Sequence, residues 1–101
     1  AVVSDEEIRL EWARIPHFYM NFYVYQYATG FSAAQALARR ILEEGQPAVE
    51  AYLAFLSSGS SDYPLAVLQR AGVDMTSPEP VRQAIQAFHE LVQELERLLE
   101  P

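Results

Sequence analysis

Apolar residues recur at three- and four-residue intervals along most of the chain, and no window of four to eight residues alternates between apolar and polar side chains. The clearest case is residues 78–100, whose apolar positions are Val81, Ile85, Phe88, Val92, Leu95 and Leu99. Such spacing lines one face of an α-helix. The sequence therefore predicts an all-α fold of about five helices.

Capping signals and prolines predict the first helix. Ser4 followed by Glu7 has the form of a capping box, in which each side chain bonds a free backbone N–H of the first turn. Pro16 blocks further helix because its ring removes a donor and disfavours helical geometry in the preceding residue. We therefore expect a helix from about Asp5 to Arg14.

The second half of the chain carries similar boundary signals. Pro47 suits the first turn of a helix, where its missing N–H costs nothing. A polar turn over residues 57–61 precedes a short helix that we expect from residue 62 or 63 to about 71. Ser77 can cap the last helix, over residues 78–100.

Residues 17–44 allow two interpretations. Either one long helix covers them with a weak point at Gly30, or two helices meet there and Ser32 caps the second. Gly45 is a natural residue to end the helix in both cases. We favour the single long helix.

Aromatic residues crowd into one short stretch: eight of the twelve lie between Trp12 and Phe31. On a helical wheel they occupy two nearly opposite faces, one with Phe18, Phe22 and Tyr25 and the other with Tyr19, Tyr23 and Tyr27. A helix with large side chains all round is normally central in its fold. The remaining residues are too few to cover it, so we expect part of its cover to come from outside this chain.

Composition excludes several classes of protein. Seven arginines and no lysine stand against fourteen acidic residues, giving a formal charge of −7, which argues against a nucleic-acid surface. The absence of cysteine excludes disulfides and thiolate zinc sites. No apolar stretch is long enough to predict a membrane span, and nothing in the pattern of residues leads us to expect secretion. No shift in composition divides residues 1–101, so we expect a single unit without an internal boundary.

Catalytic motifs are missing from the chain. His89-Glu90 looks like the start of the zinc-protease motif H-E-x-x-H, but Gln93 stands where the second histidine must be. His17 and His89 are the two histidines and lie far apart in the sequence. We therefore predict no metal-binding residues in this chain, and a self-contained metal enzyme would require stoichiometric zinc in the purified polypeptide.

The aromatic run is distinctive enough to suggest a family. The sequence Ile15-Pro16-His17-Phe18-Tyr19, continued through residues 21–30, strongly resembles the C-terminal segment of oligoendopeptidase F, a relative of thimet oligopeptidase. Further matches in order and spacing are Trp12, Gly59 to Pro64, Ala71 to Met75, and Pro78 to Pro80. The resemblance covers essentially the whole chain.

This resemblance implies a zinc metallopeptidase that cleaves oligopeptides with a mostly helical, two-lobed structure. The family binds zinc through H-E-x-x-H and a downstream glutamate, and none of these residues matches a position here. The resemblance therefore implies the C-terminal helical part of a catalytic domain that is inactive alone. Its expected partners are an oligopeptide substrate and the remainder of the parent chain, in a cytoplasmic enzyme.

The resemblance also implies roles for particular side chains. Relatives place a histidine and tyrosines opposite the zinc, where they bind the substrate backbone and the oxyanion, and His17 matches that histidine. Tyr25 is the expected catalytic tyrosine, and Tyr19 and Tyr23 are further candidates for substrate binding. On a continuous helix His17 and Tyr25 would lie about 80° apart, and Tyr19 about 160° from His17.

A second hypothesis comes from a different class of protein. The chain could be a free-standing helical interaction module whose aromatic face binds a partner peptide in a groove. Compact, cooperative folding of the isolated chain would favour this module, whereas exposed apolar surface would favour the peptidase segment.

Overall fold

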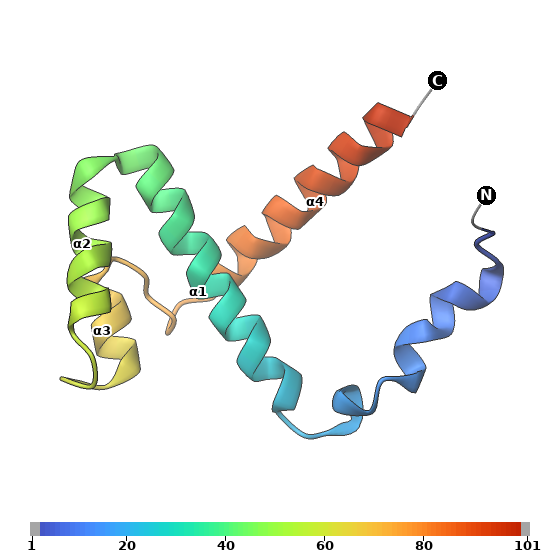
Figure 1. Ribbon diagram of the computed structural model, residues 1–101, viewed down its shortest axis with the longest axis horizontal. Coiled ribbons are helices and arrows are strands. Elements are labelled where there is room, and N and C mark those ends of the chain that lie inside the picture. The colour runs from blue at the N-terminus through green and yellow to red at the C-terminus, as the bar shows by residue number, and fades with distance from the viewer. Residues whose placement is uncertain (1–2, 100–101) are drawn as a thin grey trace.

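The computed structural model describes residues 3–99, which form helices joined by short turns (Figure 1). In chain order these are the 3₁₀ helices η1 (Glu6–Arg14) and η2 (Pro16–Tyr19) and the α-helices α1 (Tyr23–Glu44), α2 (Gln46–Ser57), α3 (Pro64–Arg70) and α4 (Glu79–Leu99). No strand forms within this range. The predicted all-α fold is confirmed.

Helix α1 is the centre of the arrangement (Figure 1). Helices α2 and α3 lie on one side of it, α4 crosses it and projects away, and η1 and η2 form an arm that leads off from its start. The radius of gyration is 17.7 Å and the extents are 50 × 38 × 24 Å. A compact domain of this length has a radius of gyration of about 13 Å, so the chain is much more open than an ordinary globular domain.

The core is small and consists mainly of small side chains. Its buried residues are Ala33, Ala36 and Leu37 of α1 together with Ala71 and Val73 of the turn after α3. Partly buried side chains from α2, α3 and the following loop pack against them, namely Tyr52, Phe55, Leu68 and Met75. Helix α4 contacts α1 near its own start, where Pro80 and Ala84 are buried. These contacts fix α2, α3 and the first half of α4 to α1.

Many large apolar side chains remain outside this core. Helix α4 carries an exposed row along its length, and within the aromatic run Phe22 and Tyr25 are 79% and 65% exposed. The exposed residues of α4 are Val81, Ile85, Phe88, Leu91, Leu95, Leu98 and Leu99. Contiguous apolar surface of this kind marks an interaction site. The expectation that the chain cannot cover its own aromatic run agrees with this open shape.

Helix α1 starts later than predicted. The prediction of one helix from residue 17 is wrong for residues 17–22, because η2 ends at Tyr19 and the backbone turns sharply before Tyr23. Phe22 lies in the left-handed region at φ 62° and ψ 4°, which no α-helix can contain. The helix then runs without a break through Gly30, as the single-helix interpretation requires.

Helix η1 occupies the range predicted for the first helix, but Asp5 caps it and not Ser4. The Asp5 carboxylate accepts a hydrogen bond from the backbone N–H of Glu7 at 3.1 Å. The shorter two-residue reach suits the tighter 3₁₀ turn. No residue of η1 is buried, so it lacks the tertiary packing that stabilises most protein helices.

The remaining predicted boundaries agree closely with the structure. Gly45, with φ 68°, ends α1, and Pro47 lies in the first turn of α2. The backbone N–H of Glu79 donates to the Ser77 hydroxyl at 3.2 Å, as expected for a cap of α4. The predicted last residue of α4, Glu100, lies outside the described residues.

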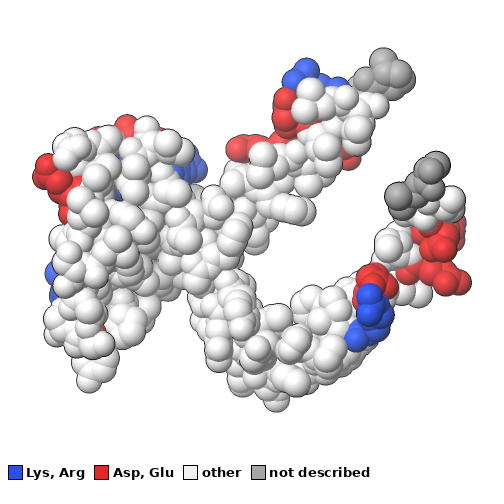
Figure 2. Space-filling view, in the orientation of Figure 1, with Lys and Arg blue, Asp and Glu red and all other residues white. Residues whose placement is uncertain are grey.

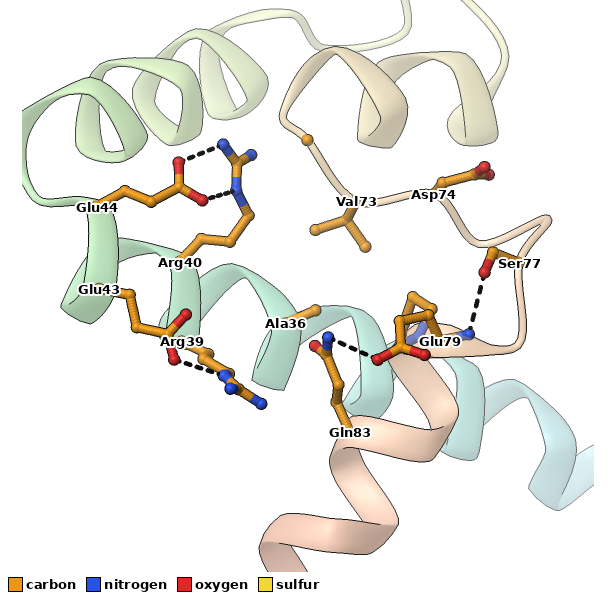
Figure 3. A pocket seen from close by; sticks show the side chains of 12 residues that line it. Ala36, Arg39, Arg40, Glu43, Glu44, Val73, Asp74, Ser77, Glu79 and Gln83 are labelled. Atoms are coloured by element: carbon orange, nitrogen blue, oxygen red, sulfur yellow. Dashed lines mark hydrogen bonds and ion pairs between the residues drawn. The ribbon is translucent and has the colours of Figure 1, made fainter.

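Arg40 ties α1 to the turn after α3. Its guanidinium donates to the carbonyl of Ala71 and pairs with Glu44, whose pKa it lowers by hydrogen bonding. Figure 3 shows this pair at the wall of a surface pocket of about 370 Å³, beside the pair of Arg39 and Glu43. Both arginines thus pair with carboxylates of α1 itself, and the bond from Arg40 to the Ala71 carbonyl is what joins α1 to the turn.

Replacing either of two glycines by alanine should change the stability of the fold, in opposite directions. Gly72 has φ 86°, and a Cβ atom there would overlap the Arg40 guanidinium, so Gly72→Ala should destabilise by about 1–3 kcal/mol. Gly30 is helical with open space around it, so Gly30→Ala should stabilise by roughly 0.5–1 kcal/mol. Thermal unfolding followed by circular dichroism measures both. An unchanged midpoint for Gly72→Ala would contradict the left-handed backbone assigned to this turn.

Candidate functional site

The bend between η2 and α1 brings His17 against Tyr23. Their ring centroids lie 5.1 Å apart with an interplanar angle of 19°, which is a stacked arrangement. His17 is exposed and Tyr23 is half-buried, so one edge of the pair remains open to solvent. Two side chains that the sequence singled out therefore meet at one point of the surface.

Tyr27 extends this pair by one helical turn. The hydroxyl oxygens of Tyr23 and Tyr27 are 3.3 Å apart and share a hydrogen bond. This bond raises the pKa of Tyr23 above its usual value, and partial burial of the phenol adds to the shift. His17, Tyr23 and Tyr27 form a continuous group, called here the histidine–tyrosine cluster.

The other two candidate tyrosines lie apart from this cluster. Tyr25 leaves α1 on nearly the opposite side from Tyr23, since two residues of an α-helix are about 200° apart. The Tyr19 hydroxyl donates to the carbonyl of Ala13 at 2.7 Å, which fastens η2 to η1. The predicted angle of about 80° between His17 and Tyr25 holds only for a continuous helix. The turn at Phe22 interrupts the helix, so that predicted geometry is wrong.

Formal charges are absent from the sequence around the cluster. Residues 15–38 contain no Asp, Glu, Lys or Arg. Figure 2 shows the resulting uncharged surface on the face in view, running from the bend into α1, with charged side chains gathered on the arm and at helix ends. The cluster therefore presents its hydroxyl and imidazole groups to solvent within a stretch of chain that carries no formal charge.

Two kinds of feature are absent from residues 3–99. In this range no three His, Cys, Asp or Glu side chains gather closely enough to hold a metal ion. The helices of the same range are also not long and apolar enough to cross a membrane.

Sequence reasoning missed Tyr27 as a member of the site. The signal was present, because Tyr23 and Tyr27 are four residues apart and side chains at that spacing are neighbours on a helix. The stack of His17 on Tyr23 had no such signal, since it depends on the left-handed backbone of Phe22.

Comparison with known proteins identifies the family of the chain. The sequence model of peptidase family M3 matches residues 1–87. The chain belongs to peptidase family M3. It is 63% identical to Oligopeptidase PepF of Bacillus subtilis over 97% of this chain, and 50% identical to the plasmid-encoded oligoendopeptidase F of Lactococcus lactis subsp. cremoris over 99%. The likeness to oligoendopeptidase F expected from the aromatic run is confirmed.

A solved structure of this family resembles the chain as well. The crystal structure of oligoendopeptidase-F from Enterococcus faecium matches 99% of this chain with 52% identity and a TM-score of 0.71. The match covers 19% of that protein, and the chain spans 15% and 17% of the two curated relatives. The chain therefore spans about one sixth of the length of these relatives.

The hydrogen bond between Tyr23 and Tyr27 predicts a pH effect. Tyr27→Phe removes the partner that raises the pKa of Tyr23, so the Tyr23 phenol should lose its proton at a lower pH. Ring-labelled tyrosine followed by NMR during a pH titration measures this shift. Tyr63→Phe, at an exposed position beyond the cluster, is the control and should leave Tyr23 unchanged. Identical titration of Tyr23 with and without the Tyr27 hydroxyl would contradict the assigned bond.

Proposed function

We propose that this chain is the C-terminal segment of a zinc-dependent oligoendopeptidase and supplies part of its substrate-binding surface. The strongest support is its similarity to enzymes named oligoendopeptidase F over nearly all of its length. The histidine–tyrosine cluster on an exposed, uncharged surface agrees with a role in holding a peptide. The open shape of the chain gives less support to a free-standing interaction module.

Peptide hydrolysis requires groups that hold the scissile peptide and stabilise the negative charge that develops on its carbonyl oxygen. His17 lies exposed at the edge of the cluster, where its imidazole can bond the substrate backbone. A tyrosine O–H aimed at the developing oxyanion can contribute roughly 3 kcal/mol to transition-state stabilisation. We propose these two roles for His17 and for a tyrosine of the cluster.

The hydrogen bond of the tyrosine pair leaves one phenol proton available to substrate. Two phenols carry two protons, and one of these occupies the bond between Tyr23 and Tyr27. Either phenol can be the donor in that bond, and the phenol that accepts keeps its own O–H free for a partner outside the pair. Tyr27 is the more exposed of the two, so we propose it as the donor to substrate together with His17, and Tyr25 remains the alternative predicted from the sequence.

Zinc chemistry would have to come from residues beyond this chain. The described residues offer no ligand set for the ion. We propose that the ligands and the general base lie in the remainder of the parent chain, and that the present chain does not hydrolyse peptides by itself. When bound, zinc would supply the polarisation of the peptide carbonyl and the activation of water.

The remainder of the parent chain is also the proposed cover of the exposed apolar row on α4. Relatives of this family are about six times longer than the chain, so ample polypeptide is available to bury that row. A second copy is a weaker candidate, because each chain carries a formal charge of −7 and two copies would repel. The expected cytoplasmic location of the parent enzyme stays a prediction.

Substitutions in the intact parent enzyme test the catalytic proposal. His17→Ala and Tyr27→Phe should each lower kcat at least tenfold, because each removes a group proposed to bond the reacting peptide. Steady-state kinetics on an oligopeptide measures the loss. Zinc content should not change, since neither residue is proposed as a ligand.

Tyr25→Phe is the matched control for these variants, because it removes one hydroxyl from the same helix outside the cluster. A loss of kcat confined to Tyr25→Phe would return the donor role to Tyr25 and contradict the geometric assignment. Normal turnover in all the variants would reduce His17 and the tyrosines to packing residues.

A second substitution tests what covers α4. Leu95→Asp should lower the midpoint of thermal unfolding of the intact parent, because it places a charge in an apolar contact. Gln93→Asp, an exposed polar position on the same helix, should have little effect. Analytical ultracentrifugation should give the same mass for both variants. Dissociation of an oligomer by Leu95→Asp would instead identify a second copy as the cover.

A further inference from the structure

Phe22 has a backbone conformation that its side chain disfavours. Its φ of 62° lies in the left-handed region, and the other residues with positive φ in the described chain are Gly45, Gly59 and Gly72. A bulky side chain in this region crowds its own backbone, which is why glycine and asparagine usually occupy it. A conformation of this kind persists only where the surrounding structure requires it.

Packing of the phenyl ring does not account for this conformation. The side chain is 79% exposed, and no side-chain hydrogen bond caps the start of α1 here. The contribution of Phe22 comes from its backbone. The N–H of Tyr23 donates to the carbonyl of Met20 at 3.2 Å, and this bond closes a turn that contains Phe22. The angles of Phe22 match the third position of a type II turn, where φ must be positive.

This turn is what allows His17 to reach Tyr23. On a continuous α-helix the two residues would be about 9 Å apart along the axis and about 120° apart around it, which excludes stacking. In the structure their centroids are 5.1 Å apart. The reversal at Phe22 separates η2 from α1 and brings the imidazole onto the ring.

We propose that Phe22 is a positioning residue: its left-handed backbone, and not its ring, holds His17 against Tyr23 and so sets the geometry of the substrate-binding cluster. The consequence for catalysis rests on the proposed function, whereas the consequence for the stack does not.

Four substitutions of Phe22 in the intact parent enzyme distinguish the role of its backbone from the role of its ring. Phe22→Asn and Phe22→Gly accept the left-handed region readily, Phe22→Val strongly disfavours it, and Phe22→Ala removes the ring while keeping a Cβ atom. The stack is measured by NMR on ring-labelled histidine, with the His17 signal assigned from its loss in His17→Gln. A ring stacked on Tyr23 shifts the His17 protons upfield. We expect this shift in the Asn, Gly and Ala variants and its loss in the Val variant.

Kinetics provide the second measurement. The Asn and Gly variants should keep kcat within about threefold of the parent enzyme, and the Val variant should lose at least tenfold, mainly in kcat. Loss of the stack in the Asn and Ala variants would overturn the inference and assign the role to the phenyl ring. Retention of the stack in the Val variant would overturn it as well. Loss of the stack in the Val variant with unchanged kcat would support the positioning role and contradict the proposed function of the cluster.

Discussion

The small number of buried apolar side chains is the constraint on which the rest of this structure depends. Its buried residues are small, mostly alanine and valine, and they gather where α1 meets the turn after α3. Burial of apolar side chains is the main favourable term in folding, and each large side chain left in water forfeits about 1.5–3 kcal/mol. The exposed row of α4 and the aromatic run of α1 are therefore surfaces that need a cover. The fold is understood most simply as one part of a larger protein, in agreement with the greater length of its relatives.

The same limit leaves part of the aromatic run accessible, as the proposed function requires. Side chains that filled the interior of a small domain could not reach a substrate, whereas here His17 and Tyr27 remain exposed. The absence of formal charge over residues 15–38 prevents competing ion pairs from forming around them. An uncharged wall with a few fixed hydroxyl and imidazole groups is a typical way to bind a peptide backbone.

Most helix boundaries could be predicted because the signals are local. Gly45, Pro47 and Ser77 act through their own backbone or side chain within one turn, and each lies where the sequence indicated. The start of α1 could not be predicted in this way, because residues 17–22 have helical spacing and Phe22 is an unusual residue for a left-handed turn. The error at this turn carried over into the expected geometry, because a continuous helix would place His17 closer to the face of Tyr25, whereas in the structure His17 stacks on Tyr23. The family could be predicted because the order of the aromatic residues is distinctive, a property that does not depend on backbone geometry.

Amide hydrogen exchange, compared between the isolated chain and the intact parent enzyme, tests the central claim most directly. If the remainder of the parent covers this segment, the amides of α4 and of the first turns of α1 exchange rapidly in the isolated chain and are strongly protected in the intact enzyme. Equal, strong protection of both helices in the isolated chain would mean that it completes its own fold, and would contradict the account.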